Sequence, residues 1–202
     1  MNIPELIGKG GKTAFSFELL PPLKGNSIQQ VYRTIDRLIE FDPKYINITT
    51  HHSENIYKED SNGVYRKVNV RKRPGSVAIA AAIQNRYGVT AIPHIISQGF
   101  TKEETEYALI DLSFLGVTNL LLLRGDTKKL DADQRAMDSH KNATGLQEQV
   151  NNFNKGISFD GSPLAPPEVP FSYGMACYPE KHEESPNMES EIFFTKMKVD
   201  NG

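Results

Sequence analysis

The sequence is poor in cysteine, lacks tryptophan and has no excess of positive charge. Its one cysteine, Cys177, excludes an internal disulfide framework and a cysteine-rich zinc module, as expected for a protein of a reducing compartment. The 23 Lys and Arg residues are balanced by 25 Asp and Glu residues, which gives a formal net charge of −2. Because there is no overall basic field, binding to nucleic acid or to an anionic membrane is disfavoured.

The sequence also lacks long apolar runs and a targeting segment. No stretch approaches the ~20 apolar residues of a membrane span, and the N-terminus has no basic segment followed by an apolar run. We therefore expect a cytoplasmic protein. The length of 202 residues, with 38% hydrophobic side chains, is typical of one globular domain.

Five apolar segments predict β-strands, and each is followed by a segment with helical periodicity. The strands are expected at 15–20, 45–49, 90–96, 119–126 and 171–178, and the helices at 27–42, 77–87, 101–115, 146–153 and 188–199. Two polar connections, 50–74 and 127–143, exceed the usual length of a structureless loop and could frame a ligand. The repeated βα unit predicts a parallel sheet with helical crossovers.

This pattern fits either an open doubly wound sheet or a barrel. No G-x-G-x-x-G motif follows the first strand, which disfavours the doubly wound alternative. We therefore predict a (β/α)8 TIM barrel in the α/β class, of which residues 1–202 supply about the first five units as a single catalytic domain truncated before strand six. Such a piece would expose the edges of its first and fifth strands, so we expect it to be poorly folded and inactive alone.

Polar residues stand near the expected carboxyl ends of all five strands. They are Glu18, Thr49, His94, Asp126 and Tyr178. In a parallel barrel these ends form one face, where active sites lie. Glu18 is either a salt-bridged strand residue or a general acid whose pKa is raised by the flanking apolar side chains. Asp126 is either a turn cap or a second carboxylate that stays ionised.

Other polar residues allow more than one interpretation. His94 could be a core histidine, whereas Tyr178 and His182 could form the wall of a site for a planar cofactor. The basic residues of 66–73 are typical of a solvated loop, although one of these cations could help to bind a ligand phosphate. Adjacent histidines on an extended segment point in opposite directions, so His51 and His52 do not predict a metal site.

Five short motifs, in this order, resemble those of methylenetetrahydrofolate reductases. They are FSFELLPP at 15–22, PH at 93–94, LRGD at 123–126, YPEKH at 178–182 and KMKVDNG at 196–202. The resemblance covers residues 13–202 and implies a barrel that binds FAD at the carboxyl ends of its strands. It also implies hydride transfer from NADH or NADPH to the flavin, and from the flavin to methylenetetrahydrofolate, which becomes methyltetrahydrofolate and feeds methionine synthesis.

The resemblance also implies roles for individual residues. Glu18 corresponds to the general acid that helps to open the folate ring, and Asp126 to the carboxylate near the flavin and the folate, so that it is both catalytic and substrate-binding. The implied FAD contacts are Thr49, Thr50, His52, His94, Arg124, Gly125, Asp126, Tyr178, His182, Ser185, Glu191 and Lys198. No metal is implied, and we expect the intact protein to be a homo-oligomer.

Two alternatives from other classes stay open. One is a metal-dependent barrel hydrolase that uses His51, His52, His94 and Asp126. The other is an inactive barrel fragment that binds neither cofactor nor folate.

Overall fold

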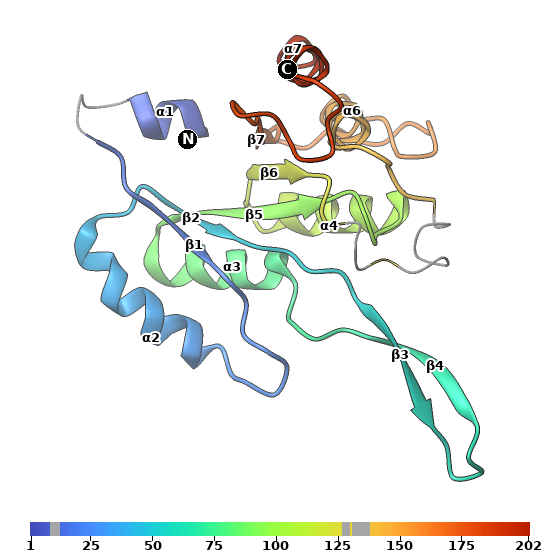
Figure 1. The fold of residues 1–202 in the computed structure, drawn as a ribbon. Helices are drawn as coiled ribbons and strands as arrows, with labels where there is room; N and C mark the ends of the chain where they lie inside the picture. The colour runs from blue at the N-terminus through green and yellow to red at the C-terminus, as the bar shows by residue number, and fades with distance from the viewer. Residues whose placement is uncertain (9–12, 127–129, 131–137) are drawn as a thin grey trace.

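A five-stranded parallel sheet dominates the computed structural model, which describes all residues except 9–12, 127–129 and 131–137 (Figure 1). Its strands are β1 (Ser16–Leu19), β2 (Tyr45–Ile48), β5 (Thr90–Ile96), β6 (Asn119–Leu123) and β7 (Ser172–Met175), side by side in that order. The order follows the chain without the reversal that defines a doubly wound sheet. The sheet therefore has the topology of part of a (β/α)8 barrel, and the predicted fold class is confirmed.

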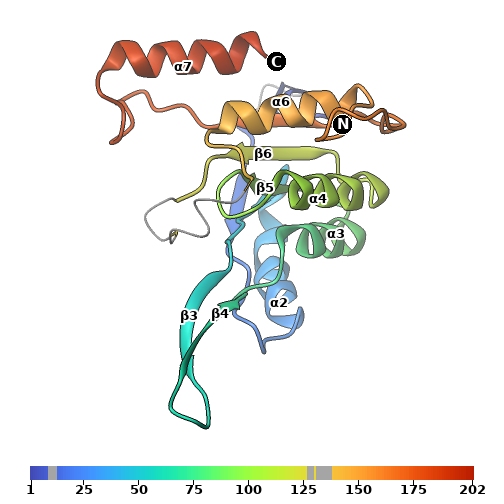
Figure 2. The ribbon, with the colours of Figure 1, turned by 90° about the vertical axis from the view of Figure 1, so that its right-hand side faces the viewer.

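Helices alternate with these strands along the chain. They are α2 (Gln29–Leu38), α3 (Ser76–Tyr87), α4 (Lys102–Phe114), α6 (Ala143–Asn154) and α7 (Met188–Asp200), and a short 3-10 turn, η1 (Ile39–Phe41), follows α2. The helices α2, α3, α4 and α6 cover one face of the sheet (Figure 2). Gly88 ends α3 in the left-handed conformation, with φ of 65°, and its N–H donates to the Gln84 carbonyl oxygen.

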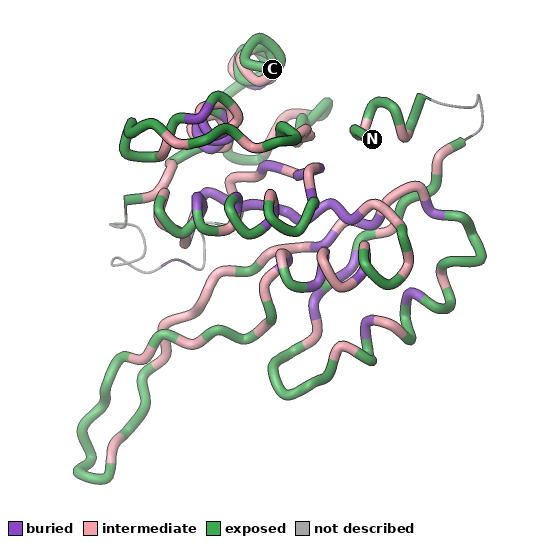
Figure 3. Tube along the Cα trace, turned by 180° about the vertical axis from the view of Figure 1, so that it is seen from behind, coloured by how far each residue is buried: buried purple, intermediate pink, exposed green. Residues whose placement is uncertain are grey.

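The core lies between the sheet and these helices, where the buried part of the trace gathers (Figure 3). Along β2, Ile46 and Ile48 are fully buried against the helices, whereas Asn47 between them is only half-buried. Likewise Leu19 is buried while Glu18 is exposed. Alternate side chains of a strand point to opposite faces, so Glu18 and Asn47 belong to the face that lines the inside of a (β/α)8 barrel.

The polar connection 50–74 is not a simple loop, and residues 66–70, which were predicted to lie in a solvated loop, belong to a strand. The connection contains an antiparallel hairpin of β3 (Glu54–Glu59) and β4 (Tyr65–Val70), which pairs with no strand of the main sheet and projects away from it (Figure 1). The turn is held by the Asp60 carboxylate, which accepts hydrogen bonds from the backbone N–H groups of Asn62 and Val64. Gly63 supplies the positive φ of 72° that the turn requires.

A short N-terminal helix, α1 (Ile3–Gly8), was also not expected. Asn2 and Glu5 cap it reciprocally, since the side chain of each accepts the backbone N–H of the other at 2.9 and 3.1 Å. The Asn119 side chain at the start of β6 donates to the Met1 carbonyl oxygen at 3.1 Å. The chain entering α1 therefore lies at the amino ends of the strands, opposite the predicted active face.

Several predicted boundaries differ from the structure; the strand expected at 119–126, for instance, ends at Leu123. The strand expected at 171–178 ends at Met175, so Tyr178 lies in the loop beyond β7. The N-cap of α2 is Ile28 rather than Ser27. Most of the connection 127–143 falls outside the described residues. That residues 1–202 form one truncated catalytic domain stays a prediction.

The start of α4 offers a test of local stability. Thr101 and Glu104 form a complete capping box, with the Glu104 N–H 3.0 Å from Thr101 Oγ1 and the Thr101 N–H 2.8 Å from Glu104 Oε2. We expect Thr101→Ala to lower the free energy of unfolding by about 1 kcal/mol, as measured by urea denaturation. Asn142→Ala is the matched control, because Asn142 occupies the N-cap of α6 without a side-chain capping bond. Equal losses in both variants would contradict the assignment.

Candidate active site

The predicted site residues lie in the last part of the strands, in the loops that follow them or on α7, and they form two groups. Glu18, Thr49, Thr50, His52 and His94 form the first group, at β1, β2 and β5. The second group follows β6 and β7 and includes residues of α7; it consists of Arg124, Gly125, Asp126, Tyr178, His182, Ser185, Glu191 and Lys198. The order of the strands places β5 next to β6, which makes the two groups neighbours.

Glu18 and His94 face each other on the inner side of the sheet. Glu18 is in register with Asn47, Asn47 is in register with Ile92, and His94 lies two residues further along β5 on the same face. Glu18 Oε2 and His94 Nε2 are 3.9 Å apart. The His94 ring is almost fully buried, and its Nε2 has no hydrogen-bond partner within the described part of the chain. A buried ring nitrogen of this kind is a place where a ligand atom can bind.

The expectation that apolar neighbours bury Glu18 was wrong. The Glu18 side chain is 62% exposed, because Phe17 and Leu19 lie on the opposite face of β1. Any desolvation of this carboxylate must therefore come from groups that pack onto the inner face of the sheet.

The end of β2 is tied to its neighbours by Thr49 and Thr50. Thr50 Oγ1 lies 2.6 Å from both the His94 carbonyl oxygen and Ser76 Oγ at the start of α3. Thr49 Oγ1 lies 3.3 Å from His51 Nε2. His52 packs on Gly99, where a Cβ would lie 2.6 Å from that of His52. These contacts fix the first group relative to β5 and the loop that follows it.

The second group surrounds a cavity of about 400 Å³ between the ends of β6 and β7, the start of α6 and one side of α7. The structure brings seven of the predicted residues to its wall. They are Arg124, Gly125, Tyr178, His182, Ser185, Glu191 and Lys198. Asp126 follows directly as an exposed residue. The first group does not line this cavity.

Several contacts order the wall of this cavity. The rings of Tyr178 and His182 meet edge to face, with centroids 4.6 Å apart. Ser185 Oγ donates to the carboxylate of the buried Glu191 at 2.5 Å, and this hydrogen bond is the main reason that the pKa of Glu191 is lowered. Lys198 Nζ donates to the Ala176 carbonyl oxygen at 2.8 Å, so its ammonium group is held at the end of β7.

Gly125 lies in the wall of the cavity and packs closely against Ile96 of β5. Its φ is +88°, and a Cβ at this position would lie 3.3 Å from the Cβ of Ile96. The adjacent backbone is fixed from β5, because the N–H of Gln98 donates to the Arg124 carbonyl oxygen at 2.9 Å and Ser97 Oγ donates to the same oxygen at 3.2 Å. Glycine is therefore the residue that this turn accommodates best.

Sequence reasoning missed three residues that shape the same cavity. Glu184 lies 2.6 Å from the Arg124 guanidinium, and Phe194 contributes an apolar part of the wall. Lys181 has a positive φ of 76°, and its ammonium group donates to the Ser185 carbonyl oxygen at 2.6 Å, which closes the loop after Tyr178. The helical spacing of Phe194 from Glu191 and Lys198 was the available signal for Phe194.

Two histidines, the buried His94 and the half-buried His140, predict a pH dependence of stability. Burial lowers the pKa of His94, although the nearby Glu18 opposes the shift, and burial is also the main cause of the lowered pKa of His140. The unfolded chain therefore binds more protons than the folded chain as pH falls through about 6.5, so the free energy of unfolding should fall towards pH 5. In urea titrations at pH 7 and 5, His140→Gln should show a smaller fall than the wild-type protein. A larger fall would contradict this assignment.

The hydrolase alternative has no ligand set in the part of the chain that the structure describes. There, no group of three or more His, Cys, Asp and Glu side chains is arranged to hold a metal ion.

Among the residues that the structure describes, no helix has the length and apolar character needed to cross a membrane.

The fold and the clustered polar residues define a (β/α)-barrel protein with an enzyme-like site at the carboxyl ends of its strands. The family model described as methylenetetrahydrofolate reductase matches residues 4–202. The chain therefore belongs to the methylenetetrahydrofolate reductase family, and the resemblance of its motifs is confirmed.

Individual relatives are similar at modest identity. The chain is 26% identical over 198 residues to methylenetetrahydrofolate reductase (NADH) 1 of Arabidopsis thaliana, covering 95% of this chain and 29% of that protein. It is 26% identical over 193 residues to a probable methylenetetrahydrofolate reductase (NADPH) of Caenorhabditis elegans, covering 93% and 24%. It is 25% identical over 192 residues to 5,10-methylenetetrahydrofolate reductase of Escherichia coli K12, covering 95% and 53%. The chain thus spans about half the length of this bacterial relative.

Proposed function

We propose that the whole protein reduces 5,10-methylenetetrahydrofolate to 5-methyltetrahydrofolate, using FAD and a reduced nicotinamide dinucleotide. The observation that carries the proposal is the convergence of seven residues on one cavity, although they come from two strand ends, a loop and a helix. Membership of the family supports the reaction class. The names of the relatives mention NADH for one and NADPH for another, so either donor is compatible with the family.

The residues around the cavity fit an FAD site. Arg124 and Lys198 would provide cations for the pyrophosphate, and Tyr178 with His182 would provide an aromatic wall. Gly125 allows a ligand to approach the backbone where a side chain would crowd Ile96. His94, with its unpartnered Nε2, would contact the flavin from the first group. The chemistry that FAD supplies when bound is transfer of a hydride from the nicotinamide to the folate.

The first group would then provide the acid chemistry. Glu18 projects from the inner face of β1 and would hold the proton that assists opening of the folate ring. His94 is held neutral by burial, so it would orient ligands through a hydrogen bond rather than through a charge. Asp126, at the end of β6, would keep a negative charge near the cationic folate species.

A spectroscopic experiment tests the proposal. The purified full-length protein should be yellow, with the absorbance of a bound flavin, and it should oxidise NADH or NADPH when menadione or methylenetetrahydrofolate is added. A correctly folded full-length protein that contains no flavin would refute the proposal. Stoichiometric zinc or manganese in place of flavin would favour the hydrolase alternative.

A further inference from the structure

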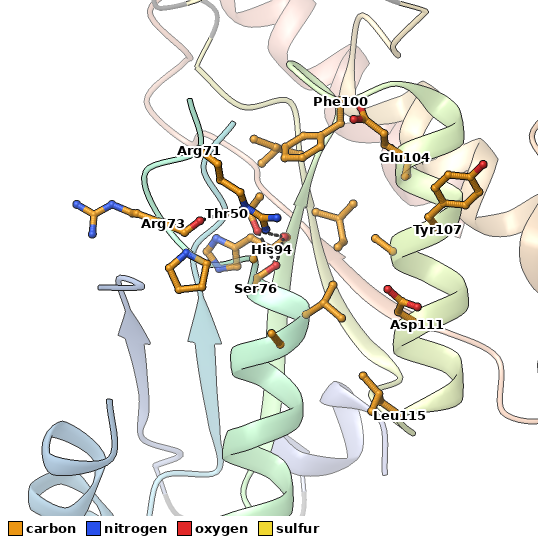
Figure 4. A pocket seen from close by; sticks show the side chains of 18 of the residues that line it. Thr50, Arg71, Arg73, Ser76, His94, Phe100, Glu104, Tyr107, Asp111 and Leu115 are labelled. Atoms are coloured by element: carbon orange, nitrogen blue, oxygen red, sulfur yellow. Dashed lines mark hydrogen bonds between the residues drawn. The ribbon is translucent and has the colours of Figure 1, made fainter. Parts of the chain in front are cut away.

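A second, larger cavity of about 940 Å³ lies between α3 and α4 (Figure 4). The wall that the two helices provide is mainly apolar, with Val77 and Ala78 from α3 and Ala108 and Leu115 from α4. The upper part of the cavity meets the carboxyl ends of β2 and β5 and the base of the β3–β4 hairpin. There, the basic residues Lys24, Arg71 and Arg73 contribute to the wall.

These three cations have no counter-charge among the described residues. Arg71 Nε donates to the Arg73 carbonyl oxygen, and Arg73 in turn donates to the Pro21 carbonyl oxygen, so both guanidinium groups contact only neutral acceptors. By contrast, Lys72 between them is paired with Glu54. Of the three consecutive cations at 71–73, Lys72 forms an ion pair, whereas Arg71 and Arg73 line the cavity.

The start of α3 adds further positive potential. Arg71 packs directly over Gly75, the N-cap of α3, with a distance of 3.6 Å between its Cζ and the position of a Cβ on Gly75. No side chain caps the first N–H groups of this helix, and its first turn holds no acidic residue. A guanidinium beside the positive end of a helix is unfavourable unless an anion lies near both.

Acidic residues on the opposite wall do not fill this role. Glu104 is engaged with the backbone of Thr101 as part of the capping box of α4, and Asp111 lies two turns further down the same helix. Figure 4 shows both carboxylates on α4, across the cavity from Arg71 and Arg73. The cations are therefore separated from the acids by the width of the cavity.

The cavity adjoins the candidate active site. Thr50 and His94 belong to its wall, and His94 Nε2 is the unpartnered buried atom 3.9 Å from Glu18. His94 therefore belongs both to the wall of this cavity and to the candidate active site.

We propose that Arg71, with Lys24, Arg73 and the start of α3, forms a subsite for an oxyanion carried by a substrate of this enzyme. The identity of the carrier rests on the proposed function, but binding of an oxyanion does not. Two sources share this chemistry: the phosphates of the nicotinamide dinucleotide and the glutamate carboxylates of the folate. A charge-assisted contact of this kind contributes about 1.5–3 kcal/mol, which corresponds to tenfold or more in affinity.

The test compares Arg71→Gln with Arg66→Gln in the full-length protein. Arg66 is a suitable control because it lies on the same hairpin, outside the cavity, with a side chain that is 72% exposed. Calorimetric titration with inorganic pyrophosphate should show binding that is about tenfold weaker in Arg71→Gln and unchanged in Arg66→Gln. The difference in pyrophosphate affinity between Arg71→Gln and the wild-type protein should be smaller at high salt, because salt screens the contact that Arg71 makes in the wild-type protein.

Steady-state kinetics then identify the carrier. A raised KM of Arg71→Gln for NADPH or NADH supports the phosphate source. A larger increase for NADPH than for NADH indicates the 2′-phosphate, and equal increases indicate the pyrophosphate that both dinucleotides share. A raised KM for folate triglutamate but not for the monoglutamate supports the carboxylate source. If pyrophosphate affinity and all of these KM values match those of Arg66→Gln, the subsite does not exist. A protein that lacks flavin but loses pyrophosphate binding in Arg71→Gln would refute the proposed function and retain the subsite.

Discussion

Glu18→Gln is expected to lower the rate of methylenetetrahydrofolate reduction by about 10²–10⁴-fold while leaving flavin binding unchanged. Glutamine keeps the shape of the side chain but cannot supply a proton. The side chain is 62% exposed on the inner face of β1, so its replacement should have little effect on folding. Oxidation of the reduced nicotinamide with menadione as acceptor should stay near the wild-type rate, because that half-reaction requires no folate proton.

The two half-reactions separate a chemical role from a structural one. Flavin content, nicotinamide oxidation and folate reduction should be measured on the same preparations of wild-type protein, Glu18→Gln and Glu40→Gln. Glu40 is an exposed carboxylate in η1 and serves as the control for loss of one negative charge. Equal losses in both half-reactions of Glu18→Gln would indicate that Glu18 supports the sheet rather than the chemistry.

The strands and most helices could be predicted because their apolar residues are continuous or periodic. The segment 119–123 is nearly all leucine and forms an interior strand of the sheet, with a paired strand on each side. The hairpin was missed because Tyr57 and Tyr65 are exposed, so its strands lack an alternation of buried and exposed residues. A local signal was nevertheless present, since Asn62-Gly63 is a favoured hairpin turn.

The site was predictable where residues follow directly from a strand end. Arg124 and Gly125 come immediately after β6, so the end of that strand fixes their place. The loop after β7 is different, because its path depends on the positive φ of Lys181 and on the contact of its side chain with Ser185. The exposure of Glu18 was missed for another reason. Its apolar neighbours in sequence lie on the other face of the strand.

Gly125→Ala is expected to abolish stable flavin binding and to lower the free energy of unfolding by about 1–3 kcal/mol. The backbone at Gly125 has a φ of +88°, where a side chain is strained. The new Cβ would also lie 3.3 Å from the Cβ of Ile96, which is fixed in the buried part of β5. The β6 turn would have to move, and with it Arg124 and Asp126.

Gly161→Ala separates backbone strain from crowding at the cavity. Gly161 has nearly the same φ, +86°, but a Cβ there would meet no atom within 4 Å. Both variants should therefore lose stability in urea denaturation, with the greater loss in Gly125→Ala, and only Gly125→Ala should lose the flavin absorbance. If both variants keep flavin equally well, the turn after β6 does not need the close approach that the proposed cofactor site assigns to it. Loss of flavin in both would instead show that the cofactor is sensitive to global stability rather than to the shape of this turn.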